Sequence, residues 1–202
     1  MEYLFLIAAA LFGYLMGSIP VGLLVGKAYG VDVRTVGSGR TGGTNVYRAA
    51  GMAAGIITGL CDALKGLVPV LIVQALGGSY LAMVLAGLGT IAGHNWSVFL
   101  GFRGGAGTMT NMGAVLAISP LTFALAVPTG AIALYVSRMA SVGSLSVSFA
   151  ILLGGALLVL IGWEPAVLLL YGLGMTAMIV YSLLPNIRRI RQGTERRIGS
   201  GR

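Results

Sequence analysis

The sequence predicts an all-α integral membrane protein with about seven transmembrane segments, its N-terminus outside and its C-terminus in the cytoplasm. The first reason is composition: 57% of the 202 residues are hydrophobic and 9% are charged, whereas soluble domains carry about 25% charged residues. The second reason is that apolar residues form runs of about 20, the length a helix needs to cross a hydrocarbon core of about 30 Å. We expect one integral-membrane domain over residues 1–202, with a basic cytoplasmic tail over residues 185–202.

The spans follow one another with short connections after a first, long polar loop. The first span is expected to stay in the protein rather than be cleaved as a signal peptide, because the N-terminus lacks a basic region and carries Glu2. It runs from Tyr3 to Gly26, with Ser18-Ile19-Pro20 and Lys27 near its end, and the loop Gly30–Gly51 follows it. The expected spans are Tyr3–Gly26, Gly51–Leu76, Tyr80–Gly93, two short segments within Asn111–Val136, Val142–Gly162 and Ala166–Leu184.

Charge placement decides how the interval Asn111–Val136 is interpreted. If Gly30–Gly51 is cytoplasmic, a single span here would place the tail arginines outside, against the tendency of basic residues to stay inside. Two short segments that break near Ser119-Pro120 instead place all 13 lysines and arginines on the cytoplasmic side except Lys65, which lies within a span. We therefore predict two segments.

This topology gathers the polar segments on one membrane face. They are Gly30–Gly51, His94–Thr110, Ser137–Ser141 and the tail from Asn186 onward. Separate parts of the chain can therefore form one site at the cytoplasmic face. Most tail arginines are interpreted as contacts to anionic lipid headgroups. Nucleic acid is not expected as a partner, because the arginines lie in short loops and a tail rather than on one amphipathic face.

The first polar loop has the composition of a phosphate site. Glycines allow the tight curvature that aims several backbone N–H groups at one anion, and arginines supply the countercharge. The expected cradle comprises Gly37-Ser38-Gly39, Gly42-Gly43-Thr44 and Arg48. The alternative is a flexible connector with topology-setting arginines. The loop is not a Walker loop, because no Gly-Lys-Ser/Thr ends it.

The second polar loop is also rich in glycine. Its core, Arg103-Gly104-Gly105-Ala106-Gly107-Thr108, is either a second anion nest or a simple turn. The only histidine, His94, stands just before it at the end of a span. A general base and a structural hydrogen bond at the interface are the two interpretations of this histidine.

One pair of charged residues falls inside a span. Asp62 and Lys65 lie three residues apart, on one helical face. Isolated charges cost about 2.5–3.5 kcal/mol each in the middle of a membrane helix, so we expect them to face the bundle interior and to pair, or to contact a ligand directly. No metal-ligand cluster and no Ser-His-Asp set is visible, so we expect neither a metal nor a cofactor.

Taken together, these residues resemble the bacterial acyl-phosphate:glycerol-3-phosphate acyltransferases over nearly the whole chain. The resemblance is carried by Gly17-Ser18-Ile19-Pro20, Asp32-Val33-Arg34, Gly37-Ser38-Gly39, Thr44-Asn45 with Arg48, Asp62-Ala63-Leu64-Lys65-Gly66, Gly93-His94, Phe99-Leu100-Gly101-Phe102, Gly104-Gly105, Gly107, Ser137, Ser141, Asn186-Ile187 and Gly193-Thr194-Glu195. It implies a small seven-helix enzyme of the bacterial inner membrane. Such enzymes move a fatty acyl group from acyl-phosphate to the sn-1 hydroxyl of glycerol 3-phosphate, giving lysophosphatidate for phospholipid synthesis.

The resemblance also implies roles for individual residues. Ser38, Arg48 and Ser141 are expected to be catalytic, with Asp62 and Lys65 as structural support. The residues expected to bind substrate or phosphate are Gly37, Gly39, Thr44, Asn45, His94, Gly104, Gly105, Gly107 and Asn186, together with Arg40 and Arg103, which are expected from the charge of the two loops rather than from the resemblance. The implied partners are acyl-phosphate, glycerol 3-phosphate and membrane lipid, whereas the sequence gives no acyl-chain preference and no oligomeric state.

The sequence departs from the family at two expected site positions. Ala106 replaces the lysine of the second loop, and Leu183 replaces the histidine three residues before the tail asparagine. One lost charge-assisted contact is worth about 1.5–3 kcal/mol, and Arg40 or Arg103 could present a charge instead. The alternatives are a diverged paralogue with another phosphorylated acceptor or little activity, and a small transporter, which the clustering of charges on one face disfavours.

Overall fold

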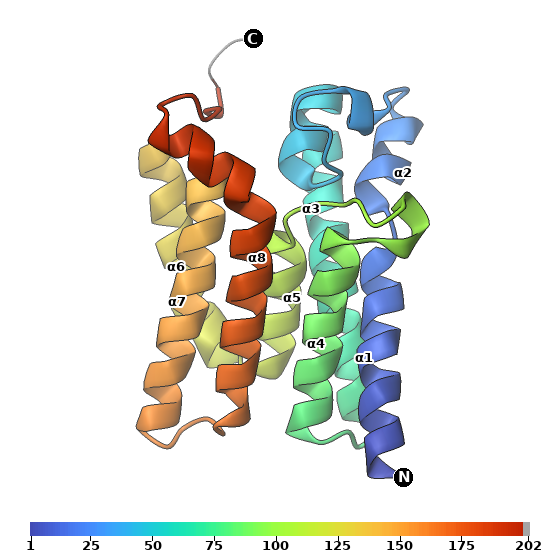
Figure 1. The fold of residues 1–202 in the computed structure, drawn as a ribbon, viewed down its shortest axis with the longest axis vertical. Helices are drawn as coiled ribbons and strands as arrows, with labels where there is room; N and C mark the ends of the chain where they lie inside the picture. Colours follow the sequence, from blue (N-terminus) through green and yellow to red (C-terminus); the bar gives the residue numbers. More distant parts are fainter. Residues whose placement is uncertain (200–202) are drawn as a thin grey trace. The chain divides into compact units, whose positions relative to one another are not determined.

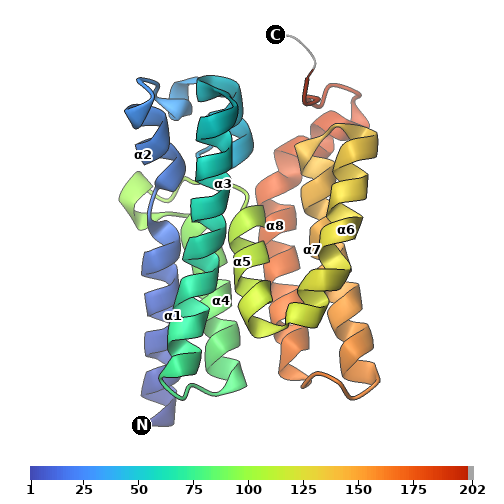
Figure 2. The ribbon, with the colours of Figure 1, turned by 180° about the vertical axis from the view of Figure 1, so that it is seen from behind.

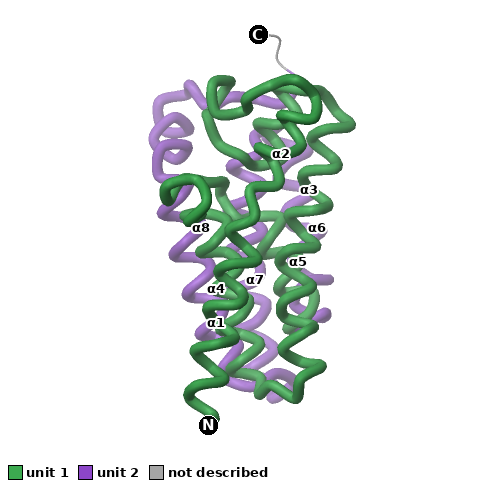
Figure 3. Tube along the Cα trace, turned by 90° about the vertical axis from the view of Figure 1, so that its right-hand side faces the viewer, with its two compact units in different colours: residues 1–118 green, residues 119–202 purple. Residues whose placement is uncertain are grey.

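The computed structural model describes residues 1–199, and their regular structure is helical (Figure 1). Two compact units are present, Met1–Ile118 and a second that begins at Ser119 (Figure 3). Unit 1 contains α1 Glu2–Ser18, α2 Val21–Ala28, η1 Val33–Thr35, α3 Gly43–Ala75, α4 Tyr80–Asn95, η2 Val98–Leu100 and α5 Thr108–Ile118. Unit 2 contains α6 Pro120–Ser137, α7 Ala140–Leu160 and α8 Val167–Arg191. The all-α prediction is confirmed.

Five helical stretches of the described chain are long and apolar enough to cross a membrane. They are Glu2–Ala28, Gly43–Ala75, Pro120–Ser137, Ala140–Leu160 and Val167–Arg191. The interval predicted as two segments is two separate helices, α5 and α6, with Ser119 between them. Ser119 caps α6 by accepting a hydrogen bond from the Thr122 backbone N–H, and Pro120 occupies the first turn, where a missing N–H costs nothing. The count of seven segments and their orientation stay predictions, as does the single domain.

Unit 1 is a bundle in which α3 packs against α1, α4 and α5 (Figure 2). Helices α1 and α4 approach so closely that their backbones touch. A Cβ atom on Gly17 would lie 2.1 Å from the Thr90 carbonyl oxygen, and one on Gly93 would lie 2.1 Å from the Tyr14 carbonyl oxygen. Small residues at such contacts allow dispersion forces to hold helices together where lipid replaces water.

Helix α1 stops before Pro20, and α2 restarts at Val21, so the predicted span Tyr3–Gly26 is broken in its last third. The residue before a proline is disfavoured in helical conformation, and a proline cannot donate to the preceding turn. The break leaves backbone carbonyls at the end of α1 without helical partners. Their replacement partners, described below, are side chains from elsewhere in unit 1.

Two predicted loop boundaries were wrong. Residues Gly43 to Ala50 were expected to be part of the polar loop, yet they are the helical start of α3, separated from the rest of α3 by Gly51 with φ 89° and ψ 178°. The tail was expected to begin at residue 185, yet α8 continues through Pro185 to Arg191. The arginines of its last turn, Arg188, Arg189 and Arg191, favour this continuation because cations stabilise a helix C-terminus.

Candidate active site

Asn45 organises the first loop. Its side-chain amide Nδ2 lies 2.8 Å from the Val33 carbonyl oxygen, 3.0 Å from that of Val36 and 2.9 Å from that of Arg40. Its Oδ1 accepts a hydrogen bond of 2.9 Å from the Ser38 backbone N–H. The side chain is buried, with 3% of its surface exposed. The Asn45 amide therefore fixes the conformation of the loop. The sequence predicted Asn45 as a phosphate contact and did not predict this structural role.

Ser38 stands at the exposed tip of this loop. The flanking Gly37 and Gly39 have φ values of 60° and 70°, a left-handed conformation in which a side chain would be strained. The Ser38 hydroxyl oxygen accepts a weak hydrogen bond of 3.4 Å from the Arg40 backbone N–H. The loop therefore presents a hydroxyl and curved backbone to the outside, while its interior is fixed by Asn45.

The helical segment from Gly43 to Ala50 carries Thr44 and Arg48 out of the first loop. It folds back on the rest of α3 across Gly51, since a Cβ atom on Gly43 would lie 3.0 Å from the Gly55 carbonyl oxygen. Its N-cap, Gly42, provides no side-chain hydrogen bond to the first helical N–H groups. A helix N-terminus without a side-chain cap is a favourable place for an anion, because its N–H groups and dipole both attract negative charge.

Beside this segment, Asp32 and Arg34 form an exposed ion pair, with 2.6 Å between Arg34 Nη2 and Asp32 Oδ2. Hydrogen bonds from the side chain and the backbone N–H of Arg34 lower the pKa of the Asp32 carboxyl to about 2. Asp32 also accepts at the start of η1, so the pair shapes the turn that leads into Asn45's contacts. The Arg34 guanidinium is therefore bound by Asp32, and the Asp32 carboxylate neutralises its charge.

The break between α1 and α2 is filled by side chains from elsewhere in unit 1. The Lys65 ammonium donates a hydrogen bond of 3.0 Å to the Ile19 carbonyl oxygen, and the Ser97 hydroxyl donates one of 2.6 Å to the Ser18 carbonyl oxygen. These are the carbonyls that the helix break leaves without helical partners. Lys65 therefore connects α3, and Ser97 connects the second loop, to the break between α1 and α2.

Lys65 also pairs with Asp62, as predicted from their spacing. Lys65 Nζ lies 2.9 Å from Asp62 Oδ1, and His94 Nδ1 lies 3.4 Å from the same oxygen. Asp62, Lys65 and His94 are 1%, 8% and 6% exposed. A buried carboxylate is thus shared by two neighbours from α3 and α4. For His94, this geometry favours the structural alternative over direct contact with substrate.

The second loop closes over the His94 ring. The Gly105 backbone N–H donates 3.0 Å to the His94 carbonyl oxygen, and a Cβ atom on Gly105 would lie 2.0 Å from His94 Nε2. Gly107, with φ 81°, also has little room, since a Cβ atom there would lie 2.6 Å from Asn95 Oδ1. Arg103 is exposed, whereas Ala106 is half-buried. Gly105 and Gly107 are therefore needed for close packing around His94 and Asn95, whether or not the loop also contacts an anion.

Both glycine-rich loops lie in the half of unit 1 that is farther from the N-terminus (Figure 1). The turn between α3 and α4 lies at the opposite end of the unit. Within unit 1, both loops thus lie in the same half (Figure 1), and the buried His94, which contacts Asp62, lies directly beneath Gly105 of the second loop.

In unit 2, Glu195 connects two predicted site residues. Its Oε1 accepts hydrogen bonds of 2.7 Å from the Ser141 hydroxyl and 2.7 Å from the Asn186 amide, and its Oε2 lies 2.7 Å from Arg189 Nε. The Glu195 side chain is 5% exposed. Ser141 and Asn186 therefore lie close together in unit 2, and their predicted roles in the site stay predictions. Glu195 was absent from the predicted site, although the Gly193-Thr194-Glu195 motif contained it. Leu183, in place of the family histidine, is buried and 3% exposed.

The Glu195 cluster predicts a pH-dependent stability. Burial opposes ionisation of Glu195, but hydrogen bonds from Asn186, Ser141 and Arg189 outweigh it and lower its pKa below the usual 4.5. A lowered folded-state pKa contributes stability above pH 4.5 that is lost as the pH falls through the folded-state pKa. We expect Glu195→Gln to lower Tm at pH 7 by about 3–6 °C, for a loss of about 1.5 kcal/mol.

The difference in Tm between this variant and the wild type should shrink below pH 4.5, because the wild type then loses the same carboxylate. Thermal unfolding in detergent at several pH values measures this. Glu2→Gln, which makes the same change at an exposed carboxylate, is the matched control and should follow the wild type throughout. A Glu195→Gln difference that is constant with pH would contradict the assignment.

No group of three or more His, Cys, Asp and Glu side chains that could hold a metal ion occurs within residues 1–199. The predicted site residues themselves offer hydroxyls, backbone N–H groups and arginines. Such a set can neutralise and orient anionic groups.

Comparison with known proteins gives a consistent result over almost the full length of the chain. A model of the family described as glycerol-3-phosphate acyltransferase matches residues 7–193. The glycerol-3-phosphate acyltransferase of Roseiflexus sp. (strain RS-1) is 40% identical over 191 residues, covering 95% of this chain and 94% of that protein. That of Rubrobacter xylanophilus is 42% identical over 193 residues, covering 94% and 93%.

A similar fold is found in crystal structures of PlsY, an integral membrane glycerol 3-phosphate acyltransferase. Its glycerol 3-phosphate form has a TM-score of 0.87 and 34% identity, with 96% of each chain covered. Its lysophosphatidic acid form has a TM-score of 0.85 and 33% identity, covering 96% of this chain and 95% of that one.

Proposed function

The chain belongs to the glycerol-3-phosphate acyltransferase family, and we propose that it transfers a fatty acyl group from acyl-phosphate to the sn-1 hydroxyl of glycerol 3-phosphate. The products are lysophosphatidate and inorganic phosphate. Among the geometric features of the chain, one carries this proposal: the first loop, in which Asn45 fixes an exposed Ser38 between two left-handed glycines immediately before an uncapped helix start.

The first loop is suited to hold a phosphate group. The N–H groups at the start of the segment from Gly43, including that of Thr44, have no side-chain cap to compete with an anion. Arg48 follows one turn later on the same segment and supplies a planar fork that matches phosphate oxygens. In this proposal Ser38 and Arg48 contact the substrates directly, and Asn45 positions the loop.

The chemistry needs little from a protein base. The sn-1 hydroxyl oxygen attacks the acyl carbonyl carbon of the mixed anhydride, an ester C–O bond forms, and the C–O bond to phosphate breaks. The electron pair leaves with the phosphate, whose oxygen takes the hydroxyl proton. Because the leaving group is already activated, the protein's contribution is positioning and charge neutralisation by arginines and backbone N–H groups.

Unit 2 carries two further residues with proposed roles. Ser141 and Asn186 share Glu195 as an acceptor, so their side chains are held in fixed directions. Ser141 is proposed to be catalytic, and Asn186 is the proposed substrate contact. The site is proposed to lie at the cytoplasmic face of the bacterial inner membrane, in a seven-segment topology with the N-terminus outside, because this places the loop and tail arginines inside.

We propose that Arg40 replaces the missing lysine of the second loop. Arg40 follows Ser38-Gly39 directly, and its carbonyl is held by Asn45, so its backbone position is fixed beside the proposed phosphate cradle. We expect Arg40→Ala to raise KM for glycerol 3-phosphate about ten- to hundredfold, the effect of about 1.5–3 kcal/mol from one charge-assisted contact.

The double variant Arg40→Ala/Ala106→Lys is expected to recover most of this loss. Initial rates over a range of glycerol 3-phosphate concentrations measure it, with Ala106→Lys alone as the control for a general gain in activity. If Arg40→Ala keeps the wild-type KM while Ala106→Lys lowers it strongly, the site lacks this charge altogether and Arg40 does not compensate.

The identity of the acyl donor is tested by giving the purified protein matched donors with the same chain. Palmitoyl-phosphate and a palmitoyl thioester are each supplied with glycerol 3-phosphate, and lysophosphatidate is quantified. The proposal expects product from palmitoyl-phosphate and none above background from the thioester. Product from the thioester alone would overturn the proposed donor and leave the family assignment intact.

A further inference from the structure

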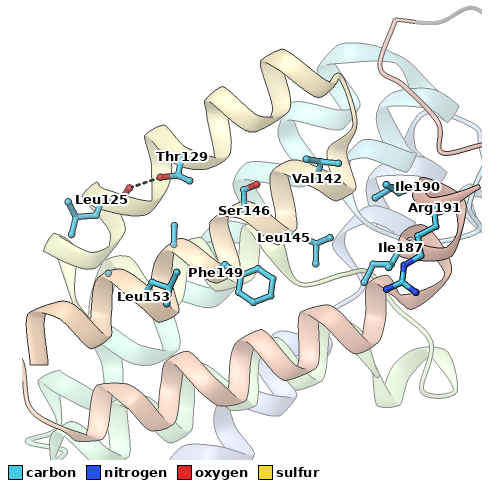
Figure 4. Close-up of a pocket in the computed structure, with 12 residues that line it drawn as sticks. Leu125, Thr129, Val142, Leu145, Ser146, Phe149, Leu153, Ile187, Ile190 and Arg191 are labelled. Carbon is cyan, nitrogen blue, oxygen red and sulfur yellow. Dashed lines mark hydrogen bonds between the residues drawn. The ribbon is translucent and has the colours of Figure 1, made fainter. Parts of the chain in front are cut away.

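We infer that unit 2 carries a binding site for an anionic phospholipid of the bilayer, with one acyl chain in an apolar groove and the phosphate on Arg191. The groove has a volume of about 780 Å³ and is formed entirely by residues of unit 2 (Figure 4). Helix α7 forms its floor between Val142 and Gly154, α6 contributes Leu125 and Thr129, and α8 contributes Ile187 and Ile190.

The dimensions of the groove match one lipid chain. The stretch of α7 from Val142 to Gly154 is about 18 Å long at 1.5 Å per residue, and one leaflet is half of a hydrocarbon core of about 30 Å. The volume lies within the range of about 300–1,000 Å³ that is common for small-molecule sites. A single acyl chain that runs from the membrane surface toward the bilayer centre would fill it.

The walls of the groove suit hydrocarbon rather than water. Leu125, Phe149 and Leu153 are 45%, 47% and 66% exposed, so they face the surroundings of the helix bundle. The Thr129 hydroxyl donates a hydrogen bond of 3.2 Å to the Leu125 carbonyl oxygen within its own helix (Figure 4). Its polarity is therefore satisfied locally, and it does not require a solvent partner inside the groove.

A single cation closes one end. Arg191 is the last residue of α8, at the end of a candidate membrane span, and its guanidinium lies beside Ile187 (Figure 4). Arg189 is paired with Glu195, whereas Arg191 forms no ion pair with another residue of 1–199. An apolar groove that ends in an unpaired guanidinium at the membrane surface is complementary to an acyl chain attached to a phosphate.

This site is separate from the proposed catalytic residues of unit 2. Ser141 and Asn186 point to Glu195, and neither lines the groove. Ser141 is 3% exposed, whereas the adjacent Val142 belongs to the groove wall. The groove therefore does not coincide with the residues to which acyl transfer is assigned, and its occupant is a lipid of the surrounding bilayer.

Native mass spectrometry of delipidated protein tests the inference. The protein is titrated with phosphatidylglycerol and with phosphatidylcholine of identical chains. We expect wild-type protein to retain phosphatidylglycerol in preference to phosphatidylcholine. Arg191→Gln should weaken phosphatidylglycerol retention about tenfold, as expected for one charge-assisted contact. Arg188 lies three residues before Arg191 and does not line the groove. Arg188→Gln removes the same charge and should leave phosphatidylglycerol retention nearly unchanged.

A second variant tests the groove itself. Ser146 lies in the middle of the floor, so Ser146→Phe should block the acyl chain and abolish retention of both lipids, with Tm in detergent as the measure of folding. Equal effects of Arg191→Gln and Arg188→Gln would overturn the site, as would equal retention of the two lipids. A dimer peak that Ser146→Phe removes, with lipid retention unchanged, would assign the groove to a second copy of the chain and also overturn it.

Discussion

Arg48→Ala is expected to lower kcat/KM for glycerol 3-phosphate by about 10²–10³, the range observed when one donor that stabilises a developing charge is removed. Arg48 lies one turn after Thr44 on the helical segment that starts after the uncapped Gly42, and the preceding loop is fixed by Asn45. Without its guanidinium, the two phosphate groups of the reaction would repel each other in a site that has lost its countercharge. Lysophosphatidate formation under kcat/KM conditions measures the effect.

Two further variants make this result specific. Arg48→Lys keeps the charge and loses the planar fork, so an intermediate activity is expected. Arg34→Ala removes another arginine of the same loop region, one that is already paired with Asp32, and should retain most of the activity. If Arg34→Ala and Arg48→Ala were equally impaired, a general loss of positive charge rather than a specific contact would be responsible.

Asp62→Ala is expected to destabilise the protein more than any other single change discussed here. It would leave the Lys65 ammonium, 8% exposed, with the Ile19 carbonyl as its remaining partner. Breaking one side of a buried ion pair costs about 3–5 kcal/mol, and about 2–4 °C in Tm corresponds to each kcal/mol in a chain of this size. A fall in Tm of about 10 °C in detergent is therefore expected.

The double variant Asp62→Ala/Lys65→Met should recover much of this stability, because it removes the unpaired charge and keeps the apolar volume. Asp32→Ala is the matched control: its carboxylate also pairs with a basic residue, yet at the protein surface, and Tm should stay near the wild-type value. A double variant as unstable as Asp62→Ala would show that the His94 contact, rather than the unpaired lysine, dominates the loss.

The break between α5 and α6 was predictable because two independent signals agreed on it. Proline at residue 120 fits the first turn of a new helix, and the distribution of arginines required an extra segment there. The pairing of Asp62 with Lys65 was equally predictable, since spacing by three residues inside an apolar run leaves few other ways to satisfy both charges.

The helical segment from Gly43 to Ala50 was not predictable from composition. Glycine density indicated a continuous loop, whereas the structure needs Gly51 only as a single left-handed break between two helical parts. The role of Asn45 was missed for a related reason: its amide contacts carbonyls of Val33, Val36 and Arg40, and no local pattern specifies such a set.

The Glu195 cluster shows the limit set by distance along the chain. Ser141 and Glu195 are 54 residues apart, and their contact depends on how α8 ends and how the following residues turn back. The family resemblance includes Gly193-Thr194-Glu195 but implies no role for the Glu195 carboxylate. The structure supplies that role, because one buried carboxylate accepts from three side chains.

Acyl transfer to glycerol 3-phosphate is the central claim, and product analysis in proteoliposomes tests it most directly. The protein is supplied with palmitoyl-phosphate and labelled glycerol 3-phosphate, and lysophosphatidate and inorganic phosphate are quantified over time. We expect both to appear in equal amounts, neither to accumulate above background without glycerol 3-phosphate, and Arg48→Ala to be strongly impaired. Wild-type protein that forms no more lysophosphatidate than the Arg48→Ala variant would contradict it.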